Sequence, residues 1–233
     1  ILLAYVDVQK AANGNKELLG ADDLLIFSFA FSQFYEAMKK IEYRRTIEDM
    51  NGKLEKAAVT DYLTGICNRN GLSQKLDEIL MQPSKKGNVL IYVDLDNFKY
   101  YNDTFGHDIG DLVLVCFARV LQKVADKKAI PVRYGGDEFI LLLPDKRVEE
   151  GVKVAEKIYK EIADGFCEEI EEMVGHEVVI PKEKKLSCSI GIAASAAGSF
   201  DGLTEALTHA DQMLYHVKKH GKGRLMVYDS PIN

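Results

Sequence analysis

The sequence predicts an α+β fold, in which a long helix of coiled-coil type precedes an antiparallel-rich βαββαβ sheet. Apolar residues recur at spacings of three and four over residues 22–58, which indicates a helix with an apolar seam. After residue 60, short apolar runs alternate with helical patterns. The segment RYGGDEFILLL, at 133–143, has the apolar runs and central glycines of a β-hairpin.

Composition and charge narrow the class of protein. The chain has 233 residues, 47% of them hydrophobic, and a formal net charge of −6. Because no bulk basic field would attract a polyanion, we expect no nucleic-acid partner. The four cysteines form no CxxC pair, and no apolar stretch reaches the roughly 20 residues of a transmembrane helix. We therefore expect reduced thiols, no membrane contact in this segment and a cytoplasmic location.

The first elements are a tail and a helical stalk. Residues 1–20 predict one strand and a polar turn, too small to fold alone, so residues 1–21 are interpreted as the end of an upstream sensor domain. In residues 22–58 a second apolar seam is displaced from the first, as in a coiled-coil stutter. The pattern predicts a helix that dimerises and transmits a signal. Packing of its phenylalanines on residues 1–20 or on a missing domain is the alternative. The two seams are Leu24, Phe27, Phe31, Phe34, Met38 and Ile41, then Tyr43, Ile47, Met50, Leu54 and Ala57.

The remaining elements follow in the order of a ferredoxin-like sheet, the arrangement of polymerase palms and nucleotide cyclases. We expect its helices on one face. In the hairpin, Gly135 and Gly136 are expected to supply the positive φ of a tight turn. The expected elements are a helix at 69–81, a strand at 89–95, a polar loop through Gly106, a helix at 109–125, the hairpin, a helix at 148–165, a strand at 185–193, a helix at 203–219 and a strand at 224–228.

Acidic side chains are expected to gather at one end of this sheet. Asp94 and Asp96 stand two apart at the end of the 89–95 strand, so both project to the same side. Asp137 and Glu138 lie in the hairpin of a neighbouring strand. Either pair alone is interpreted as a solvated turn. Together, Asp94, Asp137 and Glu138 indicate a Mg²⁺ site, because this ion takes oxygen ligands and shares them with phosphates.

Several motifs then occur in order: DYLTGICNR at 61–69, DLDNFK at 94–99, GH at 106–107, GD at 110–111, RYGGDEF at 133–139, SIG at 189–191 and AD at 210–211. Over about residues 60–228 this pattern resembles the GGDEF family of diguanylate cyclases. The resemblance implies a cyclase domain at 59–230 behind a stalk at 22–58. It also implies condensation of two GTP into cyclic di-GMP and two pyrophosphates, for bacterial second-messenger signalling. Since each protomer would hold one GTP, the implied active form is a homodimer.

The resemblance also implies roles for individual residues. Asp94 and Asp137 would bind Mg²⁺, or Mn²⁺ as the alternative ion, through carboxylates, and Leu95 through its carbonyl. Glu138 would be a second metal ligand or would help to deprotonate the 3′-hydroxyl. The catalytic set is Asp137, Glu138 and Lys99. The substrate-binding set is Asn102 and Asp111 at the guanine edge, Lys218 and Lys222 with Lys99 at the phosphates, Gly135 and Gly136 leaving room for the phosphates, and Phe98.

Two departures from the family pattern affect the expected properties. Lys222 takes the place of an arginine, and because lysine cannot form a bidentate fork we expect weaker triphosphate binding. Residues 126–129, DKKA, stand where many cyclases carry an RxxD product-inhibition site, so we expect no feedback through it. The alternative function is a catalytically silent GGDEF domain that binds GTP or cyclic di-GMP, or docks a partner. The lysine-rich run 182–185 is interpreted as a solvated turn, and the sequence assigns no role to 168–184.

Overall fold

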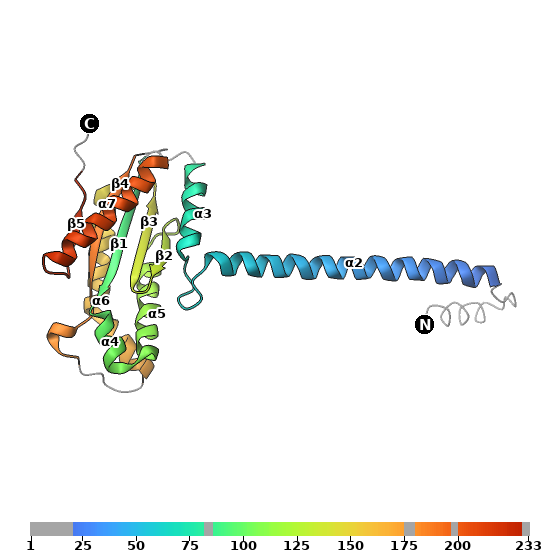
Figure 1. Ribbon diagram of the computed structural model, residues 1–233, viewed down its shortest axis with the longest axis horizontal. Helices are drawn as coiled ribbons and strands as arrows, with labels where there is room; N and C mark the ends of the chain where they lie inside the picture. The colour runs from blue at the N-terminus through green and yellow to red at the C-terminus, as the bar shows by residue number, and fades with distance from the viewer. Residues whose placement is uncertain (1–20, 82–85, 175–179, 197–199, 230–233) are drawn as a thin grey trace. The chain divides into compact units, whose positions relative to one another are not determined.

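The computed structural model describes residues 21–81, 86–174, 180–196 and 200–229 (Figure 1). By contacts the chain divides into two units, Ile1–Glu55 and Lys56–Asn233. The strand expected over residues 1–20 lies outside the described residues. No disulfide joins Cys67, Cys116 or Cys188, the cysteines whose side chains are described.

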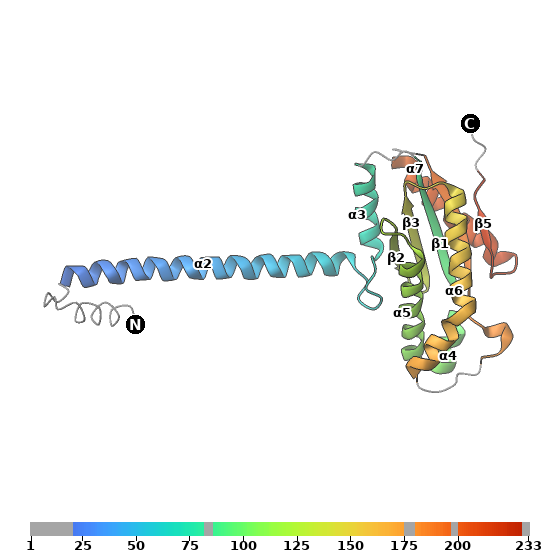
Figure 2. The same ribbon diagram turned by 180° about the vertical axis from the view of Figure 1, so that it is seen from behind.

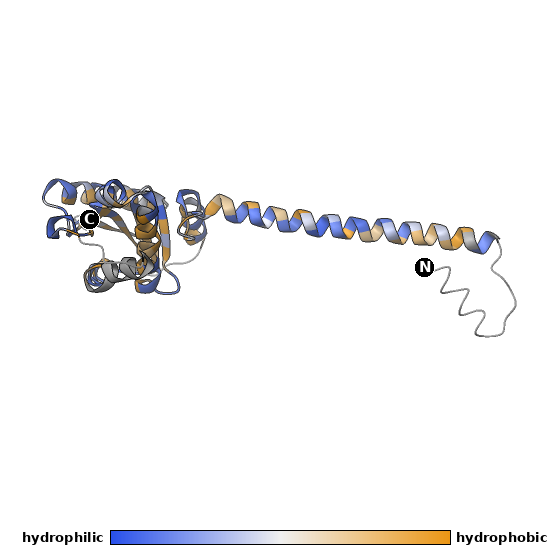
Figure 3. Cartoon of the chain, turned by 90° about the horizontal axis from the view of Figure 1, so that it is seen from below, coloured by the Kyte–Doolittle hydropathy of each residue, from blue (hydrophilic) through white to orange (hydrophobic). Residues whose placement is uncertain are grey.

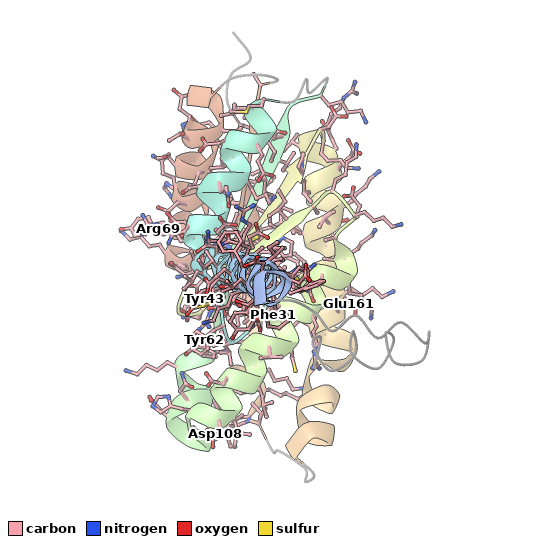
Figure 4. The ribbon with its side chains drawn as sticks, turned by 90° about the vertical axis from the view of Figure 1, so that its right-hand side faces the viewer. Phe31, Tyr43, Tyr62, Arg69, Asp108 and Glu161 are labelled. Atoms are coloured by element: carbon pink, nitrogen blue, oxygen red, sulfur yellow. The ribbon has the colours of Figure 1, made fainter. Side chains whose placement is uncertain are left out.

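The expected long helix is α2 (Ala21–Val59), with Asp22 and Asp23 in its first turn and Lys56 in its last. Charges of these signs suit the helix dipole. Apolar and polar residues are interspersed along it (Figure 3), and its apolar side chains are exposed, Phe31 and Tyr43 among them (Figure 4). None of the helices in the described part of the chain is both long and apolar enough to cross a membrane.

The second unit is built on a five-stranded sheet with the order β2-β3-β1-β4-β5 (Figure 1). Its antiparallel pairs are β1 with β3, β1 with β4, and β2 with β3, while β4 and β5 are parallel. This confirms the antiparallel-rich α+β fold. The strands are β1 (Asn88–Asp96), β2 (Ile130–Gly135), β3 (Glu138–Pro144), β4 (Ser187–Ser195) and β5 (Leu225–Val227).

Helices cover both faces of the sheet, so the expectation that they pack on one face is wrong. Ile91 of β1 shares a core with Phe117 of α5 and Ile158 of α6, whereas Leu90 shares another with Leu214 of α7. Figures 1 and 2 show α7 and α6 on opposite faces. A central strand that is apolar on both faces needs cover on both. The helices are α3 (Arg69–Leu80), α4 (Phe98–Phe105), α5 (His107–Val124), α6 (Val148–Val174) and α7 (Phe200–Lys219).

The loop expected through Gly106 is instead helix α4, followed by a tight turn into α5. Tyr101 is fully buried and Phe105 packs beside it, with ring centroids 6.0 Å apart. Asn97 precedes α4 with a left-handed φ of 65°, and Gly106, at φ 88°, separates it from α5. The segment FKYYNDTF has a short amphipathic pattern with its polar residues facing outward, and this pattern is too short to be recognised easily from the sequence. The strand that bears the acids therefore continues directly into a helix.

Gly191 sets how closely α7 approaches β4. A Cβ at this position would overlap the Ala210 carbonyl and the backbone nitrogen of Leu214. Both atoms are helix backbone and cannot rotate away as a side chain could. The close contact brings the end of α7, with Lys218, next to the carboxyl end of β1.

We predict that Gly191→Ala lowers the free energy of unfolding by roughly 2 kcal/mol, because α7 must move away from β4. Urea denaturation followed by circular dichroism measures the change. Gly52→Ala is the control, since no atom lies within 4 Å of a Cβ on that α2 glycine. It should not lower stability, because alanine favours helix. Equal stability of Gly191→Ala and the unsubstituted chain would contradict the packing argument.

Candidate active site

A pocket of about 630 Å³ opens at the carboxyl end of β1. It collects residues from β1, α4, the β2–β3 turn, the segment before β4 and the end of α7. Both acids and lysines line it. The lining residues are Asp94, Leu95, Asp96, Asn97, Phe98, Lys99, Tyr100, Asp103, Asp137, Glu138, Lys184, Lys218 and Lys222.

The antiparallel pairing of β1 with β3 brings the acids together. Asp94 stands opposite Glu138 in the register, and the Leu95 N–H donates to the Asp137 carbonyl at 3.2 Å. Most of the predicted site residues thus share one pocket although they are far apart in the chain. Those brought together are Asp94, Leu95, Phe98, Lys99, Asp137, Glu138, Lys218 and Lys222.

The turn between β2 and β3 does not use the glycine geometry that we expected. Neither Gly135 nor Gly136 has φ in the left-handed region, so the expectation of positive φ is wrong. The register shifts between Arg133 and Gly135, and this irregularity provides the bend. A Cβ on Gly136 would have no atom within 4 Å. The described part of the chain therefore gives no steric reason for glycine at 136.

Arg133 fixes this turn from outside the strand ladder. Its Nε and Nη2 donate to the Gly136 carbonyl at 3.1 and 3.0 Å, and its Nη1 lies 3.2 Å from Asp61 Oδ1 and 3.3 Å from Oδ2. Thr64 donates to Asp61 Oδ1 through its N–H at 2.9 Å and its hydroxyl at 2.6 Å. Burial raises the pKa of Asp61, but the Thr64 hydrogen bonds and the Arg133 charge bring it below its usual value. We call these three side chains and the Gly136 carbonyl the turn clamp.

Asp94 is a buried carboxylate with an unfavourable environment. Burial raises its pKa to about 6, the charges of Asp137 and Asp96 add to that rise, and Lys218 opposes it. The Lys218 Nζ lies 2.5 Å from Asp94 Oδ2. A positive charge at this position is what the carboxylate requires. The carboxylate oxygens of Asp94 therefore suit a divalent cation.

Asp96 uses its oxygens differently. It accepts from the hydroxyls of Ser187 and Ser189 at 3.1 and 2.9 Å and from the Gly223 N–H at 3.0 Å. Although it projects from β1 two residues after Asp94, these bonds tie β1 to β4 and to the turn after α7. Asp96 is thus a structural carboxylate in this arrangement.

The carboxylates share the pocket without forming a closed cluster. Among the residues that the structure describes, no three His, Cys, Asp or Glu side chains meet as a ready metal centre. Lys218 contacts Asp94, while the carboxylate of Glu138 lies 3.4 Å from the Tyr92 hydroxyl. The assignment of Asp94, Asp137 and Glu138 to one metal ion stays a prediction.

Tyr92 is a contact of Glu138 that the sequence did not reveal. It is buried in the core beneath the turn, and its ring packs edge-on to Tyr134, with centroids 5.5 Å apart. The Arg69 guanidinium lies over the Tyr134 ring, 4.9 Å from its centroid. Burial and the charge of Glu138 raise the pKa of the Tyr92 hydroxyl, which keeps it a donor. The contact with Tyr92 thus orients Glu138 on the face of the sheet that α3 and α7 cover.

Asn102 and Asp111, the predicted guanine-reading residues, do not line the pocket. Asn102 packs so closely on Gly110 that a Cβ there would overlap its side-chain amide. Asp111 follows Gly110 in α5 and is exposed. The two residues are therefore neighbours of one another across the α4–α5 turn. Their role in base recognition stays a prediction.

Sequence reasoning also missed part of the lining. Asn97, Tyr100 and Asp103 are adjacent in sequence to predicted residues, and a helix over 98–105 would have placed them near the site. Lys184 belongs to none of the motifs. The run 182–185 forms the expected exposed turn, and one of its lysines, Lys184, also lines the pocket.

Comparison with known proteins places this fold and site in context. A family model described as "Diguanylate cyclase, GGDEF domain" matches residues 58–224. The chain is 31% identical over 223 residues to the uncharacterized protein YtrP of Bacillus subtilis, covering 93% of this chain and 35% of YtrP. It is 31% identical over 232 residues to the response regulator PleD of Caulobacter vibrioides, covering 97% of this chain and 49% of PleD. The chain thus spans half or less of these relatives.

A solved structure of the coiled coil and GGDEF domain of DgcB from Caulobacter crescentus, in complex with c-di-GMP, has the same fold. The TM-score is 0.68 at 23% sequence identity, and the match covers 85% of this chain and 99% of that one. At this identity the likeness concerns the fold.

We predict that Asp94→Asn stabilises the metal-free protein at pH 7.5. The folded-state pKa is raised, so ionised Asp94 costs stability that is regained as pH falls through about 6 towards the unfolded value. The gain should be on the order of 2 kcal/mol at pH 7.5 and should vanish near pH 4. Denaturant unfolding with a chelator at both pH values measures it. Asp96→Asn is the control and should destabilise, because Asp96 accepts three hydrogen bonds. A loss of stability in Asp94→Asn at pH 7.5 would contradict the assignment.

We predict that Arg133→Lys weakens the turn clamp while keeping the charge. Lysine cannot reach Asp61 and the Gly136 carbonyl together, so unfolding should require about 1–2 kcal/mol less. Proteolysis or hydrogen exchange at residues 134–138 should increase by more than the global change. Arg147→Lys, on an exposed arginine, serves as the control. Unchanged exchange at the turn would show that the strand ladder alone holds it.

Proposed function

The chain belongs to the GGDEF domain family of diguanylate cyclases, and we propose that it condenses two GTP molecules into cyclic di-GMP with release of two pyrophosphates. The observation that supports this most is the mixed pocket at the end of β1. Carboxylates from β1 and the β2–β3 turn face lysines from α4, the segment before β4 and the end of α7. Carboxylates suit a divalent cation and lysines suit phosphates. A nucleotide triphosphate with its metal needs both.

A divalent cation, Mg²⁺ or Mn²⁺, would be held by Asp94, Asp137 and the Leu95 carbonyl. When bound, it would neutralise charge on the phosphates and lower the barrier to attack at the α-phosphate. The position of Lys218 supports this assignment, because its ammonium already contacts the carboxylate that needs a counter-charge. With a cation held by Asp94, Lys218 would be available to the terminal phosphates.

In the proposed reaction the 3′-oxygen of one GTP forms a bond to the α-phosphorus of the other. The bond between that phosphorus and the bridging oxygen breaks, and pyrophosphate leaves. The reciprocal attack by the second 3′-oxygen closes the ring and releases the second pyrophosphate. Glu138 accepts the 3′-hydroxyl proton or serves as a second metal ligand. Lys99, Lys218 and Lys222 hold the phosphates, and Asn102 and Asp111 select guanine through its N1–H and 2-amino donors. Phe98 completes the wall of the pocket.

A homodimer follows from this chemistry, because each proposed pocket accommodates one GTP and two must react. The exposed apolar residues of α2 offer a surface for a second copy, among them Phe31, Phe34, Met38 and Ile41. Their spacing is that of a coiled-coil seam. Residues upstream would supply the input signal. In the alternative, a catalytically silent domain that binds GTP or cyclic di-GMP, Asp94 and Asp137 would still suit the metal of a bound nucleotide, but Glu138 would have no proton to accept.

The test is an assay of the purified chain with GTP and Mg²⁺ over a range of protein concentrations. Cyclic di-GMP, measured by chromatography, should rise faster than linearly with protein at low concentration, because two protomers are needed. Asp137→Ala and Glu138→Ala should each lower the rate at least about 100-fold. Glu161→Ala is the control. It removes an acid paired with Lys123 outside the pocket (Figure 4) and should leave the rate unchanged. GTP binding without product at every concentration would support the silent domain instead.

A further inference from the structure

A short segment outside every sequence motif borders the pocket. We call residues 181–186, which lead into β4, the strap. Its centre is a single 3₁₀ turn over Lys182–Lys184, closed by the Lys184 N–H donating to the Pro181 carbonyl at 2.9 Å. The strap therefore has a defined backbone conformation beside the site.

The strap is attached to the start of α4 by two side chains. The Asn97 amide donates to the carbonyls of Lys185 at 3.0 Å and Glu183 at 3.4 Å. The hydroxyl of the fully buried Tyr101 accepts from the Leu186 N–H at 3.0 Å. Asn97 adopts a left-handed φ of 65°, which non-glycine residues rarely do, and these bonds help to hold it there. The segment that supplies Phe98 and Lys99 to the pocket thus also positions the strap.

Among the strap's charged residues, Lys184 alone lines the pocket. Its Nζ lies 5.7 Å from the centroid of the Tyr100 ring, another lining residue, at the outer range of a cation–π contact. Lys182 and Lys185 carry the same charge on the same exposed turn but are not part of the lining. The backbone conformation of the strap therefore selects one lysine of three.

The balance of charges in the pocket favours a phosphate-binding role for Lys184. Five acids line it, namely Asp94, Asp96, Asp103, Asp137 and Glu138, against four lysines, Lys99, Lys184, Lys218 and Lys222. One of those lysines, Lys218, is engaged with Asp94. A triphosphate adds several more negative charges, which a point charge on a flexible stem can meet. Without Lys184, the cations left for phosphate would be fewer still.

We propose that Lys184 is a further substrate-binding residue, whose ammonium contacts the β- and γ-phosphates of bound GTP and thereby favours the triphosphate over shorter nucleotides. The assignment rests on the proposed function, since it takes GTP as the occupant of the pocket. It adds to that function a contact from the strap, which the motif residues do not include. The exposed position of Lys184 leaves its ammonium free to follow the phosphates as they bind and leave.

The experiment measures equilibrium binding of 3′-deoxy-GTP in the presence of Mg²⁺, because this nucleotide lacks the attacking hydroxyl and is not consumed. Binding of 3′-deoxyguanosine is measured in parallel. Lys184→Gln should weaken 3′-deoxy-GTP binding about tenfold, the loss expected for one charge-assisted hydrogen bond, and leave the nucleoside unaffected. Lys184→Arg should recover most of the affinity. In turnover assays, KM for GTP should rise more than kcat falls.

Lys182→Gln and Lys185→Gln are the matched controls, since each removes one charge from the same strap. Affinity within twofold of the unsubstituted chain for both controls supports a specific contact. If they weaken binding as much as Lys184→Gln, the loss of affinity comes from the overall positive charge of the strap, and the inference is wrong. It is also wrong if Lys184→Gln binds 3′-deoxy-GTP normally, or loses the nucleoside equally. If the unsubstituted chain binds no 3′-deoxy-GTP, the proposed function fails together with the inference.

Discussion

The turn clamp is the interaction on which the candidate site depends. Asp137 and Glu138 follow the point where the β2–β3 ladder becomes irregular, so pairing with β2 does not fully fix the turn, although on the other side the Leu95 N–H of β1 donates to the Asp137 carbonyl. Arg133 replaces the missing ladder bonds by holding the Gly136 carbonyl, and Asp61 holds Arg133 in a partly buried pair. Such a forked, charge-assisted contact is stronger than an exposed ion pair.

The buried carboxylate of Asp94 lowers the stability of the fold. A carboxylate at the buried end of a central strand, beside two other acids, is an unfavourable arrangement that Lys218 offsets only in part. Asp96, two residues on, avoids that cost by accepting hydrogen bonds from Ser187, Ser189 and Gly223. The same strand thus carries one carboxylate whose hydrogen bonds stabilise the sheet and one whose burial only Lys218 offsets, which is suited to a cation. Sites that sacrifice stability in this way are typical of functional positions.

Much of the fold and of the acidic half of the site could be predicted from the sequence, because both follow from short-range patterns. Alternation and helical periodicity predict the strands and long helices, and antiparallel neighbours bring Asp94 near Glu138. The failed predictions have physical causes. Helix α4 was missed because it is short and polar on its outer side. The uniformly apolar pattern of β1 does not tell which helices cover its two faces, and the β2–β3 turn bends through an irregular register instead of a positive glycine φ. Lys184 was missed because its position depends on Asn97, far away in the chain.

The phosphate end of the pocket follows a different principle from the metal end. The acids are fixed by strand register and by the turn clamp, so no other side chain can take the place of an acid that is replaced. The lysines come from α4, the strap, the end of α7 and the turn after it, so they are supplied by separate elements and not by one strand register. Lys222 sits in that last turn at a left-handed φ of 49°, its N–H bonded to the Val217 carbonyl, where the family pattern has arginine. A lysine cannot replace the fork of an arginine, but a second point charge from another element can restore the lost attraction. A charge from the strap would thus partly offset the substitution at Lys222, because a further positive charge near the phosphate oxygens adds to their electrostatic attraction.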